Sequence, residues 1–177
     1  MAIALGRAPR AIAETPEALL LACHEKMRTF AARARSLAAM EPRAESDVEV
    51  SEEAAAIARY FGESLALHVR DEEESILPRL VGRSPALDRA LEAMEQDHAE
   101  HEPWLQALVH ALGRIAEQPQ CLREEQLDLA TAAREVEDRL RVHLAAEEAT
   151  VLPALGALSE TERLAILREI RARRRPA

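Results

Sequence analysis

The sequence is poor in aromatic residues and in the β-branched residues that favour strands. Only 2% of its 177 residues are aromatic, namely Phe30, Tyr60, Phe61 and Trp104. Ala, Leu, Glu and Arg dominate instead, and these are strong helix formers, whereas strands favour β-branched and aromatic side chains. The composition therefore argues against a β-rich fold and predicts an all-α protein.

The sequence also has few cysteines and no long apolar run. Its two cysteines, Cys23 and Cys121, form no CxxC pair and no haem-attachment motif, which favours a reducing compartment over a secreted, disulfide-linked protein. Residues 1–14 hold too short an apolar stretch for a signal peptide, and no segment approaches the run of about 18 apolar residues that a membrane span requires. We therefore expect a cytoplasmic protein that does not enter a membrane.

The balance of charge argues against binding to nucleic acid. The net charge is -9, and an acidic surface repels the phosphate backbone. The basic run RARRRP, at residues 171–176, is the local exception. We expect it to form a disordered tail, with the binding of a partner as the alternative.

Start and stop signals divide the chain into five helices. Thr15-Pro16 and Ser84-Pro85 each place an N-cap before a Pro at the first helical position. Ser159 and Glu162 have the spacing of a capping box, which opens a short last helix. The four long helices are predicted to span about residues 16–40, 51–81, 85–118 and 122–156.

These helices favour one compact arrangement. Long helices joined by short connections pack as antiparallel neighbours, so we predict an antiparallel up-down four-helix bundle with an additional short C-terminal helix. A length of 177 residues suits one domain. We expect an N-terminal extension over residues 1–14, the bundle over residues 15–157, and the C-terminal helix with its basic tail over residues 158–177.

Two stretches of the sequence share a spaced pattern of His, paired Glu and Leu-Pro. They are HVRDEEESILP, residues 68–78, and HLAAEEATVLP, residues 143–153. In each stretch a His precedes a Glu by four residues, so both side chains lie on the same face of a helix. One such pair is more often a surface contact than a pair of ligands, so other residues must decide between the two interpretations.

The depth of other histidines in the bundle favours ligands. With a rise of about 1.5 Å per residue, four histidines and two glutamates fall roughly 13 to 21 Å from one end of the bundle. Apolar residues at helical spacing around the two His-Glu pairs indicate that these faces point inward. Buried charges are costly unless they are paired or bind a cation. The pattern therefore predicts a metal site formed by His24, His68, Glu72, His98, His143 and Glu147.

The kinds of ligand restrict the metal. Imidazole and carboxylate groups without sulfur suit iron, manganese or zinc. Two carboxylates that can each bridge, with histidines on both sides, suit two ions better than one. Cys23 adjoins His24 but points about 100° away around the helix, so we interpret it as a packing residue.

The ordered set of these elements resembles the hemerythrin-like family of HHE cation-binding domains, over about residues 15–157. The matching elements are His24, HVRDE with the following ILP, Asp97-His98, and HLAAE with VLP. The resemblance implies two non-haem iron ions inside the bundle, bridged by Glu72, Glu147 and an oxo or hydroxo group. It implies that His24 and His68 serve one iron and that His98 and His143 serve the other.

The resemblance also implies a class of small-molecule partner. Members of this family bind O2 reversibly, sense or handle oxygen, peroxide or nitric oxide, or take part in iron homeostasis and iron-sulfur repair. We expect a protein that binds metal and O2 or a related oxidant, more than a dedicated enzyme. Whether the chain forms a homo-oligomer stays open.

The third helix departs from the pattern of oxygen-carrying hemerythrins. Those proteins have a second His four residues after the first, whereas Glu102 stands there in this sequence and His101 lies three residues after His98. His101 and Glu102 are therefore further candidate ligands. If neither completes the second ion's shell, an open coordination position would favour redox chemistry over reversible O2 storage.

Three other classes compete with this interpretation. A ferritin-like di-iron protein needs two Glu-x-x-His motifs, and only Glu95 to His98 has that spacing. A metal-buffering protein would bind iron or zinc without responding to O2. A metal-free structural or regulatory bundle would merely accommodate its histidines.

Overall fold

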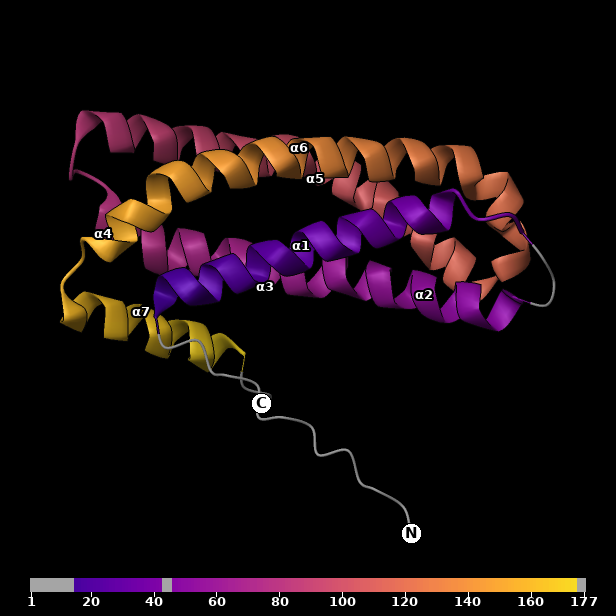
Figure 1. Ribbon diagram of the computed structural model, residues 1–177, viewed down its shortest axis with the longest axis horizontal. Helices are drawn as coiled ribbons and strands as arrows, with labels where there is room; N and C mark the ends of the chain where they lie inside the picture. The colour runs from indigo at the N-terminus through magenta and orange to yellow at the C-terminus, as the bar shows by residue number, and fades with distance from the viewer. Residues whose placement is uncertain (1–14, 43–45, 175–177) are drawn as a thin grey trace, which may run out of the picture.

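Four rods of helix lie side by side and form an elongated bundle, shown in the computed structural model of Figure 1. The structure describes residues 15–42 and 46–174. α1 and α5 each pack against α2 and α6, and no strand occurs within the described ranges, as predicted for an all-α bundle. The rods are α1 (Pro16–Ala38), a composite rod of α2 (Asp47–Arg59), α3 (Leu65–Asp71) and α4 (Leu77–Leu80), α5 (Pro85–Glu117), and α6 (Leu122–Gly156).

The predicted caps start three of the helices. The Thr15 hydroxyl accepts the amide N–H of Ala18, and the Ser84 hydroxyl accepts that of Leu87, each just before a Pro. Ser159 and Glu162 form the reciprocal capping box that opens α7 (Glu160–Arg173). The second rod begins at Asp47, earlier than the predicted Ser51, and Ser46 stands at its N-cap position without a capping hydrogen bond from its side chain.

The second rod contains two π-helical segments that the sequence analysis did not predict. They are η2 (Tyr60–Ser64) and η3 (Glu72–Ile76), and in η3 the amide of Leu77 donates to the carbonyl of Glu72, five residues back. A π turn carries an extra residue and rotates the side chains that follow, and such turns are frequent at functional sites. In η3 the wide turn buries Glu72 and Ile76 as well as Ser75.

A polar layer separates two apolar clusters along the bundle. The larger cluster includes Met27, Leu112 and Leu129, and the smaller one includes Leu20 and Val151. Between them lies a layer that contains most of the buried polar residues of the four rods, with the partly buried His98 beside them, and this layer has apolar packing on both sides. Those residues are His24, His68, Asp71, Glu72, His101, His143 and Glu147.

The last helix covers one side of the second rod. α7 packs against α1, α3 and η3, and its Ile166 and Ile170 join the smaller apolar cluster. Among the described residues, no helix has both the length and the apolarity that crossing a membrane takes.

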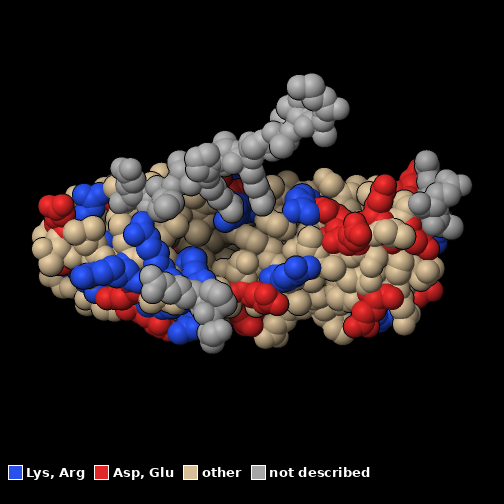
Figure 2. Space-filling view, turned by 90° about the horizontal axis from the view of Figure 1, so that it is seen from below, with Lys and Arg blue, Asp and Glu red and all other residues tan. Residues whose placement is uncertain are grey.

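The basic run at the end of α7 is ordered as far as it is described, so its interpretation as a disordered tail is wrong for residues 171–174. Arg173 Nη1 lies 2.8 Å from Asp71 Oδ1, and Arg174 also pairs with Asp71. Figure 2 shows Lys and Arg side chains gathered over the half of this face where α7 lies, with acidic groups among them. Residues 1–14 and 175–177, which include the predicted N-terminal extension and the last part of the tail, lie outside the described residues.

Candidate metal centre

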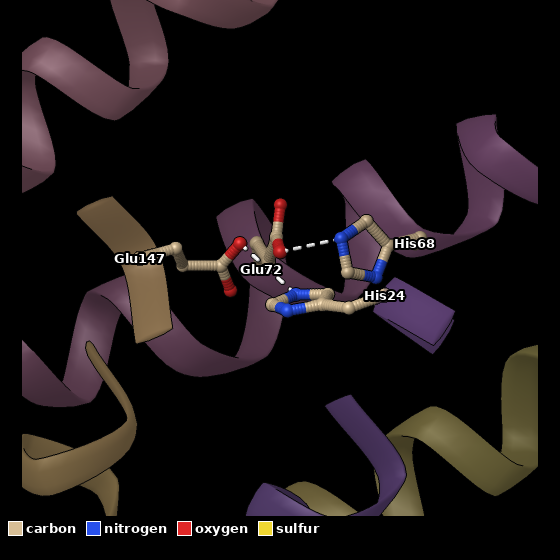
Figure 3. A group of neighbouring side chains, drawn as sticks. All are labelled: His24, His68, Glu72 and Glu147. Atoms are coloured by element: carbon tan, nitrogen blue, oxygen red, sulfur yellow. Dashed lines mark ion pairs between the residues drawn. The ribbon is translucent and has the colours of Figure 1, made fainter. Parts of the chain in front are cut away.

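Four side chains from three rods converge in the polar layer (Figure 3). α1 carries His24, α3 carries His68, η3 starts with Glu72, and α6 carries Glu147. One donor atom from each lies within 4.8 Å of the others. His24 Nε2 is 3.1 Å from Glu147 Oε2, and His68 Nε2 is 2.7 Å from Glu72 Oε1.

A second group of donors shares Glu72 with the first. It comprises Glu72, His98 and His143, again with all donor atoms within 4.8 Å. His98 Nε2 lies 3.2 Å from Glu72 Oε2, and the ring centroids of His98 and His143 are 5.0 Å apart. The two oxygens of Glu72 therefore face different histidines, one in each group.

Glu147 also lies between the two groups, but through a single oxygen. Its Oε2 is 3.1 Å from His24 Nε2 and 3.9 Å from His143 Nε2. All six residues of the predicted ligand set thus occupy one layer, with the pairing of His24 with His68 and of His98 with His143 that the resemblance implied.

The donor atoms fit a cation better than they fit one another. Although they lie close together, these buried atoms have no hydrogen-bond partner: His24 Nε2, His68 Nε2, His98 Nε2 and both carboxylate oxygens of Glu72 and Glu147. Buried polar atoms without partners are costly, and imidazole and carboxylate donors around one point are a typical arrangement for a bound metal ion. The residues present therefore fit metal ions.

A carboxylate stands behind the ring of three of the histidines. Each contacts Nδ1, which leaves Nε2 facing the centre, and such partners orient a ligand ring and raise its basicity. The contacts join His24 to Glu148 at 2.9 Å, His98 to Glu73 at 3.3 Å and His143 to Asp97 at 3.1 Å. His68 is the exception, because its Nδ1 is buried without a hydrogen-bond partner.

These outer carboxylates differ in how firmly they are held. Arg28 donates to Glu148 Oε1 at 2.7 Å, so Glu148 is fixed from two sides. The side chain of Glu73 is 44% exposed and, within the described part of the chain, contacts only His98 at hydrogen-bond distance. The Glu148 contact is therefore the more rigid of the two.

Burial and mutual charge act in opposite directions within the centre. Burial lowers the pKa of His68, but the Glu72 carboxylate beside it outweighs this and raises the pKa to about 10. Burial, reinforced by the nearby charge of Glu72, raises the pKa of Glu147 to about 7. For Glu72, burial is outweighed by His68 and His98, so its pKa falls well below its usual range.

His101 and Glu102 lie outside both donor groups. The ring of His101 is buried, 5.4 Å from that of His143, and burial lowers its pKa to about 4. Glu102 is exposed and accepts a hydrogen bond from Gln106 Nε2 at 2.8 Å. Their role as ligands stays a prediction, with His101 the nearer candidate.

Two contacts of the layer were not predicted. Asp97 was noted only as the partner of His98 in the sequence, yet it contacts His143 on α6. Asp71 is buried beside Glu72 and pairs with α7. The sequence held one signal for this second contact: Asp71 adjoins the predicted ligand Glu72, and the basic run at residues 171–176 offers arginines that could pair with it.

The comparisons with known proteins agree with the geometry. The family model of the hemerythrin HHE cation-binding domain matches residues 15–155. No curated protein gives a significant match. Since the matched region spans most of the sequence and contains all six residues of the predicted ligand set, the chain belongs to the hemerythrin HHE cation-binding domain family.

Proposed function

We propose that this protein binds two non-haem iron ions and uses them to bind or sense a small oxidant such as O2, nitric oxide or peroxide. The observation that carries this proposal is the position of Glu72, whose two oxygens face His68 at 2.7 Å and His98 at 3.2 Å. A carboxylate shared by two groups of histidines suits a pair of ions better than one ion. The free thiols of Cys23 and Cys121 support the expected cytoplasmic location.

The residues of the chain divide the work between them. His24 and His68 would hold one iron, His98 and His143 the other, with Glu72 and Glu147 between them. When bound, reduced iron supplies electrons to the small oxidant. Asp97, Glu73 and Glu148 would keep three histidine rings oriented with Nε2 toward the centre.

The two halves of the centre are unequal, which supports a binding position for the oxidant. The first group offers four donors, whereas the second offers Glu72, His98 and His143. We propose that the ion held by the second group keeps a free coordination position, because fewer protein ligands surround it.

Metal analysis combined with an optical spectrum tests the proposal. The protein is loaded with ferrous iron without O2, freed of excess iron, and then exposed to O2, nitric oxide or hydrogen peroxide. Two irons per chain and a new absorption band after exposure are expected. His143→Ala is expected to lose the ion of the second group and most of the spectral response.

Two outcomes would favour the competing classes. Iron that binds without any response to the three oxidants would indicate metal buffering or iron homeostasis. A protein that folds with equal stability with and without iron, and binds none, would be a metal-free bundle, since a bound ion stabilises the folded state.

A further inference from the structure

A large cavity lies beside the metal centre. Its volume is about 750 Å³, and it opens between the second rod and α5. The rings of His68, His98, His101 and His143 form its inner end, whereas His24 takes no part in its lining. The cavity therefore reaches the centre from the side of the second donor group.

Small residues on the facing helices make room for this cavity. Gly62 and Ala66 on the second rod, and Ala99 on α5, line it and are exposed. α5 packs more closely against α2 and η2 than against α3, so the two rods lie farther apart at the level of His68. The space follows from the sequence of both rods.

The cavity is far larger than a diatomic oxidant requires. A water molecule occupies roughly 30 Å³ in the liquid. Sites for organic molecules typically measure about 300 to 1,000 Å³ and combine an apolar lining with a few polar groups. The volume of this cavity therefore matches that of a site for an organic molecule.

The wall of the cavity has an apolar part and an acidic edge. The apolar part includes Phe61, Leu65, Leu105, Val109 and Leu140. The acidic edge runs along α5, where Glu95, Ala99 and Glu102 line the cavity at spacings of four and three residues. Pro103 lacks an amide N–H, so the carbonyl of Ala99 has no donor from the usual position in its helix.

The edge is rich in hydrogen-bond acceptors. Arg70 also lines the cavity, but its guanidinium is engaged by Glu74 at 2.8 Å. Among the described residues, no Lys or Arg pairs with Glu95 or Glu102. An acceptor-rich acidic edge beside an apolar wall suits a cation on an apolar body.

We propose that this cavity binds a small organic amine, with its apolar body against Phe61 and Leu65 and its ammonium group at the edge formed by Glu95, the Ala99 carbonyl and Glu102. The bound molecule would lie beside His98 and His143. This goes beyond the proposed function, because the binding needs neither a response to O2 nor a particular metal.

Calorimetric titration with three probes of equal chain length tests the proposal. The probes are n-octylamine, octanoate and 1-octanol, added to the full chain both without metal and after iron loading, at neutral pH, where an alkyl amine is protonated like the side chain of Lys. The amine is expected to bind about tenfold more tightly than the alcohol, and octanoate more weakly still. Glu95→Gln combined with Glu102→Gln should remove the preference for the amine over the alcohol.

A matched pair of variants tests the location. At Gly62 an added Cβ would meet only Val109, at 3.9 Å, so Gly62→Leu is expected to fold and to abolish amine binding. The control is Gly113→Leu, the same change in α5 away from the cavity, which should leave binding unchanged. Should Gly62→Leu fail to fold, Ala66→Leu makes the same test.

Three results would overturn the proposal: no binding of the amine, equal binding of all three probes, or amine binding that survives Gly62→Leu. Each can be told apart from failure of the proposed function. If the amine binds but iron does not, the cavity proposal holds and the proposed function fails. If iron binds and responds to O2 but the amine does not bind, only the cavity proposal fails.

Discussion

The first His-Glu stretch, residues 68–78, and the second, residues 143–153, supply the polar layer from helices of different form. The first spans α3, η3 and α4, with the π turn beginning at Glu72 itself. The second lies wholly in α6, which stays α-helical past Pro153. Glu72 faces two histidines with two oxygens, whereas Glu147 faces two with one.

The residues between the shared positions explain the difference. Asp71 and Ser75 are buried in the first stretch and contact Arg173 of α7, at 2.8 Å and 2.6 Å. The corresponding Ala146 and Thr150 of the second stretch are exposed. The second stretch thus presents candidate ligands on one face, whereas the first presents candidate ligands on one face and a docking face for α7 on the other.

The largest effect on metal binding is expected from replacing each of the two central glutamates, Glu72 and Glu147, by Gln in turn. Glu72→Gln removes the charge that both donor groups share and should abolish binding of both ions. Glu147→Gln, the matched change in α6, should leave one ion bound, because Glu147 faces the histidines through one oxygen. Metal analysis after anaerobic loading gives the result, and equal loss in both variants would show that the two carboxylates are equivalent.

The next effect concerns the docking face. Asp71→Ala leaves Arg173 and Arg174 without their shared acid and should lower the free energy of unfolding by about 2 to 3 kcal/mol, since Arg174 is partly exposed. Ala146→Asp places an acid at the corresponding exposed position and should change stability by less than about 0.5 kcal/mol. Urea denaturation measures both, and a small loss for Asp71→Ala would mean that the docking of α7 adds little.

A smaller effect is expected from the carboxylates behind the histidine rings. Glu148→Gln should weaken metal binding by about 10-fold to 100-fold, because this acid is held by Arg28 as well as by His24. Glu73→Gln should cost less, because Glu73 is more exposed and its contact with His98 is longer. Competition with a chelator measures both affinities; a larger loss for Glu73→Gln would contradict the difference in rigidity.

The smallest effect is the response of α7 to acid. Hydrogen bonds from Arg79 lower the pKa of Glu169, with Ser75 and Arg173 adding to the effect. A lowered pKa means that the contribution to stability is fully present above the ordinary Glu value of about 4.3 and is lost as the pH falls from that value through the lower pKa of the folded state. Amide exchange in α7, compared with that in α6, should therefore rise only as the pH falls below about 4.3, and Glu169→Gln should reduce that difference.

The sequence predicted the ends of most helices and that six particular residues would meet in the polar layer. Caps such as Thr15 and Ser84 act within a few residues, so local patterns suffice to place them. The layer was predictable because the positions of His24 and Glu147 along antiparallel helices fix their depth, and depth follows from the helical rise.

Contacts between distant segments were not predictable in the same way. The π turn at Glu72 packs against α7, and no local pattern encodes this contact between distant segments. The pairing of Asp71 with Arg173 joins residues 102 positions apart. The cavity required the separation of α3 from α5, although Gly62, Ala66 and Ala99 were visible as small residues.

The pairing of Asp71 with Arg173 also orders events during synthesis. The two residues are separated by 102 positions, and chains grow at about 5 to 20 residues per second. Arg173 is therefore synthesised roughly 5 to 20 seconds after Asp71. During that time the first His-Glu stretch lacks the arginine that covers its outer face in the folded protein. The side of the polar layer that faces α7 is therefore closed last, only after the C-terminal helix has been made.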